Sequence, residues 1–438
     1  MSYLLNFLYL ALLALASPWL LGQAVRKGKY REGFAAKLLG QVPRREPGRP
    51  CIWFHAVSVG EVNLLATLLA RIAARRPDCE CVISTTTMTG FALARKKYPE
   101  TTLFYCPLDF TWAVRRALAR VRPNLLVLAE LELWPNLIRL SHAAGVRVAI
   151  VNGRLSERSF RGYRRCLWFV RPLLERIDFI GAQNQEYAER FCALGANAQS
   201  VHVTGSIKFD GAQTDRHNPA TERLRALAGF APDDVVFLAG STQDPEESLS
   251  LAAFRELAPA HPRLRLVLVP RHPDRFATVA ALLDASGLAW QRRSALDVGP
   301  RDPATQAFLV DAVGELGAWW GTANVGFVGG SLSNRGGQNM IEPAAYGAAV
   351  SFGPNTRNFR DIVAALLAEQ AAVVVHNGEE LTAFVRRALE EPAFAAELGQ
   401  RAKTFVSRQL GATERTMAGV LPLLVDERTA IPVDRSAA

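Results

Sequence analysis

The stretch CIWFHAVSVGEVNLLATLLARIAAR, residues 51–75, contains the unit that recurs along this chain. Residues 51–55 have strong strand propensity, a short turn follows, and residues 62–75 have the apolar spacing of a helix. Similar apolar runs alternate with helical patterns as far as residue 205, which predicts a parallel sheet covered by helices on both faces. The other strands expected here are 81–85, 103–106, 124–130, 147–151, 178–182 and 201–205, and further helices include 111–120 and 135–144.

The alternation stops at 209–232, a segment with several turn residues, and then restarts. The 438 residues are too many for one ordinary core and fit two domains of about 200 residues each. We therefore predict two Rossmann-like domains, 26–210 and 211–438, facing a central cleft that binds ligands at the carboxyl ends of the strands. The pattern near 413–424 predicts a final helix, for which a return to the first domain is one alternative that the sequence alone does not decide. The strands expected in the second domain are 235–240, 264–270, 307–312, 325–330, 348–353 and 371–376.

The first 25 residues have the features of a membrane anchor. Residues 3–22 carry no charge, and about 20 apolar residues suffice to span a bilayer. Between Arg26 and Pro50, eight Lys or Arg stand against two Glu. By the positive-inside rule, residues 1–25 are expected to form a single transmembrane helix that leaves the body of the protein in the cytoplasm. A helix that lies on the membrane or is buried in the protein is the alternative.

Composition narrows the classes of partner. The formal net charge is +10, which suits nucleic acid, anionic lipid or phosphorylated substrates. The sequence has neither a Cys/His finger nor an aromatic RNA-binding motif, so nucleic acid is not expected as a partner. The six cysteines form no C-x-x-C motif and fit reduced thiols of a cytosolic domain. The sequence also lacks a P-loop, a G-x-G-x-x-G motif and a His/Cys cluster with metal spacing, which disfavours metal-dependent phosphate chemistry.

Three carboxylates follow predicted strands of the first domain. Glu61 opens the helix after 51–55, where the helix dipole favours its ionised form, and it is a candidate general base. Glu130 and Glu132 lie two positions apart at the end of 124–130, so they are expected to share a face, where repulsion tends to raise the pKa of one of them. The alternatives are a helix-stabilising carboxylate at 61 and exposed loop acids at 130 and 132.

The second domain has features that suit a phosphate. Ser241 and Thr242 follow 235–240 and precede a helical pattern, an arrangement that binds an anion or simply caps the helix. The guanidinium of Arg271 suits phosphate, unless it is only a solvated surface group. Glu342 is placed to accept hydrogen bonds from a ribose diol. The junction after 325–330 has glycines that allow a ligand to approach the backbone closely, namely Gly329, Gly330, Gly336 and Gly337.

One more segment bears on the acceptor. Residues 159–177 combine arginines, among them Arg161, Arg164, Arg165 and Arg171, with Tyr163, Trp168 and other apolar residues. A basic-aromatic helix of this kind suits a surface that lies on anionic lipid. A core helix with a solvated basic face is the alternative.

Taken in order, the motifs of this chain resemble those of the 3-deoxy-D-manno-octulosonic acid (Kdo) transferases of lipopolysaccharide assembly. The resemblance covers nearly the whole chain, and it is specific as an ordered set although each motif alone is weak. In the first half the motifs are HAVSVGE (55–61), ELELWPN (130–136), NGRLS (152–156), AQN (182–184) and GSIKFD (205–210). In the second half they are GST (240–242), VPRHP (269–273), GEL (314–316), FVGGSL (327–332) and GGQNMIEP (336–343).

The resemblance implies a GT-B fold and an enzyme of lipid A biosynthesis at the bacterial inner membrane. It implies CMP-Kdo as donor, a lipid A precursor of the lipid IVA type as acceptor, an anionic membrane surface as partner, and inversion at the anomeric carbon without a metal or other cofactor. It also implies that Glu61 is the catalytic base and that Glu130 and Glu132 lie near the reacting sugar.

The resemblance assigns further residues to the two substrates. Glu342 is expected on the ribose, and 314–316 near the cytosine. The acceptor-side residues are Ser58, Gly60 and Lys208. The donor-site residues are Ser241, Thr242, Arg271, His272, Gly314, Glu315, Leu316, Gly329, Gly330, Gly337, Asn339 and Glu342.

Two positions depart from the family pattern. Many relatives carry His where this chain has Gln338, and some carry His where it has Gln243. Because Gln does not titrate, a proton-transfer or cationic role is not expected at position 338. Two other functions stay open, namely a GT-B enzyme that uses another nucleotide sugar, such as a UDP-sugar, on a lipid-linked acceptor, and a non-catalytic membrane scaffold. The presence of all the acidic and basic site residues argues against the scaffold.

Overall fold

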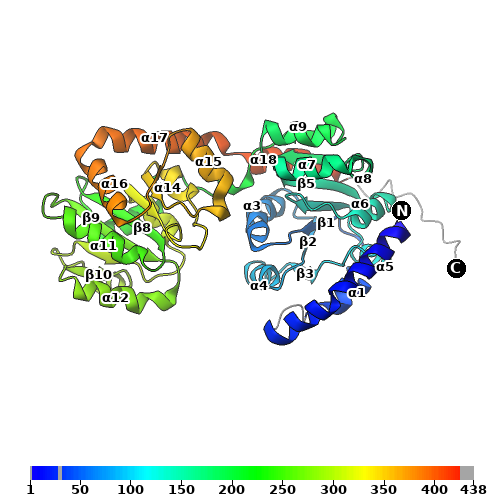
Figure 1. The fold of residues 1–438 in the computed structure, drawn as a ribbon, viewed down its shortest axis with the longest axis horizontal. Helices are drawn as coiled ribbons and strands as arrows, with labels where there is room; N and C mark the ends of the chain where they lie inside the picture. The colour runs from blue at the N-terminus through cyan, green and yellow to red at the C-terminus, as the bar shows by residue number, and fades with distance from the viewer. Residues whose placement is uncertain (1, 28–31, 425–438) are drawn as a thin grey trace. The chain divides into compact units, whose positions relative to one another are not determined.

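The computed structural model of the chain describes residues 2–27 and 32–424 (Figure 1). The chain divides into two compact units, of which unit 1 is Met1–Asp210 with Leu410–Ala438 and unit 2 is Gly211–Gln409. The chain therefore leaves unit 1 after residue 210 and returns to it at residue 410. Two parts of the predicted segments lie outside the described residues, namely 28–31 of the basic segment and 425–438 of the second domain.

Unit 1 is built on one parallel sheet. Its seven strands lie in the order β3-β2-β1-β4-β5-β6-β7. All seven strands predicted for the first half form, with the bounds β1 Cys51–His55, β2 Glu80–Thr85, β3 Thr102–Tyr105, β4 Leu125–Ala129, β5 Arg147–Gly153, β6 Phe179–Ala182 and β7 Val201–Val203. The order reverses between β1 and β4, and open α/β sheets bind ligands beside such a switch point.

Helices cover both faces of this sheet. Alternate residues of β1 face opposite sides, so Trp53 packs with α5, α6, α8 and α9, whereas Phe54 packs with α3 and α18. This burial on both faces explains the continuous apolar strands. The helices of unit 1 are α1 Ser2–Lys27, α2 Phe34–Leu39, α3 Val59–Arg75, α4 Met88–Lys97, α5 Thr111–Val121, α6 Pro135–Ala143, α7 Glu157–Arg165, α8 Leu167–Leu174, α9 Gln185–Ala193 and α18 Ala412–Val420.

The returning helix α18 is bound tightly to unit 1. The carboxylate of Asp210 accepts hydrogen bonds from the backbone N–H groups of Gly411, Ala412 and Thr413, which are free donors at a helix start. Further along α18, Gly419 packs so closely on the ring of Phe179 that a side chain would not fit. The helix predicted near 413–424 thus completes the core of unit 1.

The N-terminal helix α1 also contacts unit 1. The buried side chain of Asn6 donates to Thr111 Oγ1 at 2.7 Å, and the Tyr9 hydroxyl donates to Asp109 Oδ2 at 3.2 Å. Among the described residues, no helix combines the length and the apolar character needed to cross a membrane. The transmembrane anchor predicted at residues 1–25 is therefore not supported.

The prediction of one continuous basic-aromatic helix over 159–177 was wrong. The segment consists of two helices, α7 and α8, which meet at Cys166. The Cys166 backbone, at φ −116° and ψ 35°, is outside the helical region and ends α7. Trp168 follows this break with 74% of its surface exposed.

Unit 2 has the same architecture, with the strand order β10-β11-β9-β8-β12-β13-β14. The order reverses between β8 and β12. The strands are β8 Val235–Thr242, β9 Leu264–Pro270, β10 Trp290–Arg292, β11 Ala307–Leu309, β12 Val325–Val328, β13 Ala349–Phe352 and β14 Val373–Val374. The helices are α10 Pro219–Ala228, α11 Glu246–Leu257, α12 Phe276–Ala285, α13 Leu316–Trp320, α14 Ile341–Tyr346, α15 Arg360–Ala368, α16 Gly378–Glu390 and α17 Pro392–Gln409. The edge strand β10 was not predicted, because its three residues are amphipathic and pair on one side only.

Candidate active site

The first group of site residues lies at the switch point of unit 1. The neighbouring parallel strands β1 and β4 lead directly into the segments that carry Glu61 and Glu130. Their carboxyl ends meet at one edge of the sheet, so residues far apart in sequence converge there. Burial raises the pKa of Glu132 most, and the charges of both Glu61 and Glu130 raise it further. The structure thus brings the three predicted carboxylates into one electrostatic cluster.

Glu61 is held by hydrogen bonds at the start of α3. Ser58, the N-cap, accepts from the Glu61 backbone N–H at 3.3 Å and donates its hydroxyl to Glu61 Oε1 at 2.7 Å. The Val57 N–H donates to Glu61 Oε2 at 2.7 Å. This is a capping box, so the helix-stabilising role considered for Glu61 is present as well. Burial raises the pKa of Glu61, against the hydrogen bonds from Ser58 and Val57. The exposed Gly60 leaves the surface beside Ser58 open.

Glu130 has a different environment. Its backbone has φ 56°, in the left-handed region that few side-chain-bearing residues adopt. Its carboxylate accepts from Lys208 Nζ at 2.9 Å, and both side chains are partly exposed. The segment with Lys208 is fixed by Asn152, whose buried Oδ1 accepts from the Ile207 N–H at 3.1 Å. Lys208 therefore lies beside the acidic cluster and compensates the charge of Glu130.

Glu132 lies among apolar groups. It accepts a hydrogen bond from Trp134 Nε1 at 2.8 Å. Burial raises the pKa of Glu132 to about 7, opposed by the Trp134 bond and reinforced by the charges of Glu61 and Glu130. Glu132 is also part of the lining of a pocket of about 560 Å³ that α1 and Tyr163 help to form. Of the two neighbouring carboxyls, Glu132 is thus the one suited to carry a proton near neutral pH.

The raised pKa of Glu132 predicts a pH-dependent stability. Its folded pKa exceeds the unfolded value of 4.5, so folding favours the protonated form and stability falls as pH rises from 4.5 to about 7. We expect Glu132→Gln to raise the Tm at pH 8 and to change it little at pH 4.5, as measured by thermal denaturation. Glu130→Gln is the matched control, because it removes the ion pair with Lys208 and should not raise the Tm. An equal Tm change of Glu132→Gln at both pH values would contradict this prediction.

The second group of site residues lies at the switch point of unit 2. β8 ends in Ser241, with φ 55°, and in the fully buried Thr242. The backbone N–H of Arg271, directly after β9, donates to the Thr242 carbonyl at 3.0 Å, which joins the ends of the two strands. The Arg271 side chain is exposed, and His272 follows it at the start of a short turn. These predicted donor residues therefore come together at one edge of the sheet.

The glycines after β12 are required by close packing. A side chain at Gly329 would lie 2.6 Å from the Thr242 Cα and 2.7 Å from the Ser241 carbonyl oxygen. Gly330 and Gly337 have φ 66° and 76°, which favours glycine. Gly329 lets the ends of β8 and β12 meet, and the other two let the following loop turn back on them.

The loop ends in a polar group at the start of α14. Asn339 Nδ2 donates to Glu342 Oε1 at 2.9 Å, and Asn339 Oδ1 accepts from the Ile341 N–H at 3.1 Å. Burial raises the pKa of Glu342, whereas the Asn339 bond and the charge of Arg271 lower it. The charge of Arg271 thus acts on Glu342. Together they offer a cation for phosphate and an acceptor for hydroxyl groups.

The expected position of residues 314–316 near the cytosine stays a prediction. The Glu315 carboxylate accepts two hydrogen bonds from the buried Arg293, at 2.8 and 2.9 Å. This bidentate pair fixes the orientation of the Glu315 side chain within unit 2.

Sequence reasoning missed residues that fix the positions of the candidate site residues. Asn152 and Trp134 were part of motifs, yet no spacing indicated their contacts with the Lys208 segment and with Glu132. Glu246 is fully buried, and its carboxylate accepts backbone hydrogen bonds from the glycine-rich loop. Its sequence neighbourhood reads only as the start of an ordinary helix. Within residues 2–27 and 32–424, His, Cys, Asp and Glu form no group of three or more suited to a metal ion.

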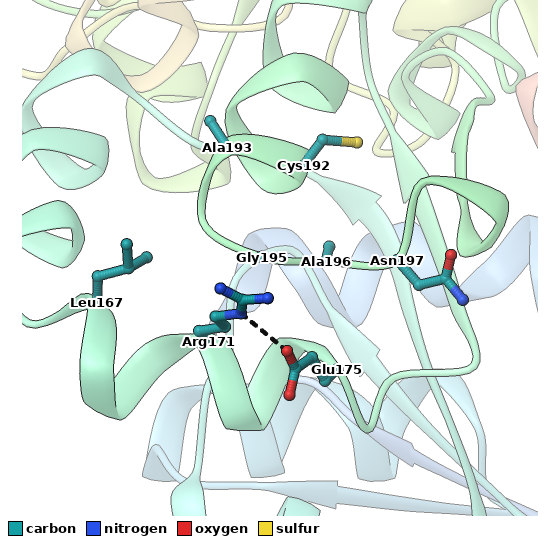
Figure 2. A pocket seen from close by; sticks show the side chains of 8 residues that line it. All are labelled: Leu167, Arg171, Glu175, Cys192, Ala193, Gly195, Ala196 and Asn197. Carbon is teal, nitrogen blue, oxygen red and sulfur yellow. Dashed lines mark hydrogen bonds and ion pairs between the residues drawn. The ribbon is translucent and has the colours of Figure 1, made fainter.

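Another pocket of unit 1 is separate from these residues. Figure 2 shows it between α8 and the turn after α9. Its volume is about 520 Å³. Arg171 and Glu175 pair across one helix turn at 2.9 Å on its wall (Figure 2), and the stem of Arg171 packs under Gly195. None of the predicted catalytic or donor residues line this pocket, so we do not assign it to the reaction.

The two α/β units and their likeness to solved structures identify the fold of the chain. The chain is similar to the solved UDP-GlcNAc 2-epimerase of Neisseria meningitidis bound to UDP-GlcNAc, with a TM-score of 0.55 and 12% identity over 86% of this chain and 100% of that chain. At this identity the likeness concerns the fold alone. Two parallel α/β sheets with such neighbours make this a GT-B-like protein.

Sequence comparison adds the family. Residues 29–211 match the family described as 3-Deoxy-D-manno-octulosonic-acid transferase (kdotransferase). The 3-deoxy-D-manno-octulosonic acid transferase of Bordetella pertussis is 35% identical over 91% of this chain and 94% of the relative. The solved C-terminal CMP-Kdo binding domain of WaaA from Acinetobacter baumannii is 30% identical, with a TM-score of 0.40, over 43% of this chain and 96% of that chain. The chain belongs to the 3-deoxy-D-manno-octulosonic acid transferase family and is a glycosyltransferase.

Proposed function

We propose that this enzyme transfers Kdo from CMP-Kdo to a lipid A precursor of the lipid IVA type, with inversion at the anomeric carbon. The observation that carries the proposal is Glu61, a buried carboxylate positioned by Ser58 and Val57 at the switch point of unit 1. The Glu61 carboxylate accepts from the Ser58 hydroxyl and from the backbone N–H groups of Val57 and Ser58, and a carboxylate has about four acceptor sites. A lone pair is thus left for the proton of a substrate.

The reaction is a single displacement. Glu61 takes the proton from an acceptor hydroxyl as that oxygen bonds to the anomeric carbon of Kdo, while the bond from that carbon to the CMP phosphate breaks. CMP leaves with the electron pair. Attack opposite the leaving group gives inversion and requires one base and no enzyme nucleophile. Lys208 compensates the charge of Glu130, and a protonated Glu132 avoids adding a third negative charge beside the base.

Unit 2 supplies the donor site in this proposal. Arg271 provides a permanent positive charge for the phosphate, and Asn339 with Glu342 contacts the ribose. Charge compensation by Arg271 supports a reaction without a metal ion or other cofactor. The placement of the three groups at a strand end and at the start of α14 supports this assignment.

The pocket beside Glu132 supports a lipid as acceptor. Its lining is mainly apolar and comes from α1, the turn before α5, the loop after β4 and α7, namely Tyr9, Leu12, Leu13, Leu108, Asp109, Phe110, Leu131, Glu132, Leu133, Trp134, Pro135 and Tyr163. An acyl chain fits such a lining, because burying apolar surface yields roughly 25 cal/mol per Å². A lipid in this pocket places its polar part beside the acidic cluster.

We further propose that the enzyme works on the cytoplasmic face of the bacterial inner membrane. Leu4, Phe7, Leu8 and Leu15 of α1 are between 50% and 80% exposed, which is costly in water and favourable at a bilayer surface. The exposed Arg164 and Arg165 of α7 add positive charge that attracts anionic lipid.

The proposal is tested by the release of CMP from CMP-Kdo, with and without a tetraacylated lipid A precursor. We expect acceptor-dependent release, a mass gain on the lipid, and the same rate in excess EDTA. Competition by CMP but not UDP distinguishes this donor from a UDP-sugar. Folded protein without release would refute the function, and a loss of activity in EDTA that Mg²⁺ restores would refute metal independence.

A further inference from the structure

Glu246 forms the most fully bonded carboxylate of the described donor region. It is the first residue of α11 and is 0% exposed. Oε2 accepts from the backbone N–H groups of Gln243 and Gly330 at 2.9 and 2.7 Å. Oε1 accepts from those of Ser331 and Leu332, both at 2.9 Å. One side chain of α11 thus ties the turn after β8 to the loop after β12.

The charge of this carboxylate is compensated by backbone donors. Two oxygens with two N–H donors each use about all four lone-pair positions of a carboxylate. The start of α11 adds the positive end of a helix dipole. In the part of the chain that the structure describes, no Lys or Arg forms an ion pair with Glu246. The loop therefore surrounds an anion that belongs to the protein itself.

This arrangement changes what the loop offers to a ligand. Three successive N–H groups, at 330–332, have the direction that in other folds binds a phosphate. Here Glu246 occupies them. The backbone of Gly329 also packs closely on this carboxylate, because a side chain at position 329 would lie 2.7 Å from Glu246 Oε2. The backbone N–H groups of residues 330–332 are thus not available for the donor's phosphate.

Side chains at this edge of the sheet are still available to donate hydrogen bonds to a phosphate. A Cβ built on Gly330 would lie 3.2 Å from Gln338 Nε2 and 3.3 Å from Gln243 Nε2, so two amide groups flank the loop that Glu246 holds. The exposed Arg271 guanidinium extends from the strand end joined to Thr242. The positions of these amides depend on the loop and on the turn, and both are bonded to Glu246.

We propose that Glu246 is a positioning residue of the donor site. It serves as the internal anion of the glycine-rich loop, and the phosphate of the donor is consequently bound by side chains, with Gln243 and Gln338 set in place by the loop. This inference rests on the proposed function only in taking CMP-Kdo as the donor.

The test compares Glu246→Gln with Glu247→Gln. Glu247 is the next residue of α11 and is also buried, but it pairs with Arg275 at 3.0 Å and not with the loop. In Glu246→Gln, one oxygen becomes an NH₂ group that faces N–H donors, so the loop is displaced. We measure the Kd of CMP and of cytidine by calorimetry, the KM and kcat for CMP-Kdo, and the Tm of both variants.

We expect Glu246→Gln to weaken CMP binding and to raise the KM of CMP-Kdo by roughly 10-fold or more, as the loss of bonds to a charged group predicts. Cytidine, which lacks the phosphate, should lose about 3-fold at most, and kcat at saturating donor should change by a similar factor at most. Glu247→Gln should lower the Tm as much as Glu246→Gln while leaving the CMP Kd within about 2-fold.

Three outcomes would overturn the inference. CMP affinity unchanged or increased in Glu246→Gln would mean that the phosphate uses the loop N–H groups. An equal loss for CMP and cytidine, or an equal loss in Glu247→Gln, would reduce Glu246 to a stability role. Failure of the wild-type protein to bind CMP or to release it from CMP-Kdo would instead refute the proposed function, so the two failures are distinguishable.

Discussion

Replacing Glu61 by Gln is expected to lower kcat by about 10³-fold, because a positioned general base contributes roughly 10² to 10⁴ in rate. Gln keeps the size of the side chain and can still accept from the Val57 N–H, but it cannot take a proton from the acceptor hydroxyl. The measurement is the rate of acceptor-dependent CMP release at saturating CMP-Kdo. Since the wild-type base must be ionised, its activity should rise with pH through the Glu61 pKa, which burial raises.

The control for Glu61 is Ser58→Ala. This change removes the hydroxyl that donates to Glu61 at 2.7 Å and leaves the carboxylate in place. It should cost about 1 kcal/mol of stability as a lost N-cap and lower kcat far less than the loss of the carboxylate. Glu61→Gln should bind CMP normally, because the proposed donor site lies in unit 2. Full activity of Glu61→Gln would remove the base assignment.

Replacing Arg271 by Ala is the second change with a large expected effect. A bond to a charged group is worth about 1.5–3 kcal/mol, so the CMP Kd and the kcat/KM for CMP-Kdo should worsen by roughly 10- to 150-fold. The exposed guanidinium makes little contribution to packing, so the Tm should stay near that of the wild type. Calorimetry with CMP and the same release assay measure both constants.

Arg271→Lys separates charge from geometry. Lys keeps the positive charge and loses the planar fork, so an intermediate loss is expected if phosphate is bound bidentately. Alanine and lysine variants that both bind CMP like the wild type would show that Arg271 is a solvated surface group, which the sequence alone had left open.

Much of the fold was predictable because it depends on local patterns. All seven strands of unit 1 were expected from apolar runs buried on both faces, and the turn to unit 2 was marked by the polar segment after Phe209. The order of the strands was not predictable, since the pairing of β1 with β4 rests on contacts between distant segments. Without that order, Glu61 and Glu130 were two separate hypotheses.

The site residues divide in the same way. Glu61 was visible because it follows a strand and opens a helix within one short stretch. The role of Glu246 could not be predicted, because three of its four backbone partners lie 84 to 86 residues away in the sequence. Its local sequence has only the ordinary acidic start of a helix. The break at Cys166 was missed because it depends on backbone angles in a segment whose residue types all permit helix. Groups that act through the backbone of distant loops leave no spacing for a motif to record.

The return of the chain to unit 1 has a consequence for biosynthesis. Helix α18 supplies Met417 and Val420 to the core that also contains Phe54 and Phe179, and Asp210 caps its first turn. The ribosome therefore synthesises all of unit 2 before it synthesises α18, the helix that completes unit 1. During that interval one face of the older sheet lacks part of its cover, while the younger unit has all of its strands. The first part of the protein to be synthesised thus completes its core only after unit 2 has been made, and exposed apolar surface in such an interval favours aggregation.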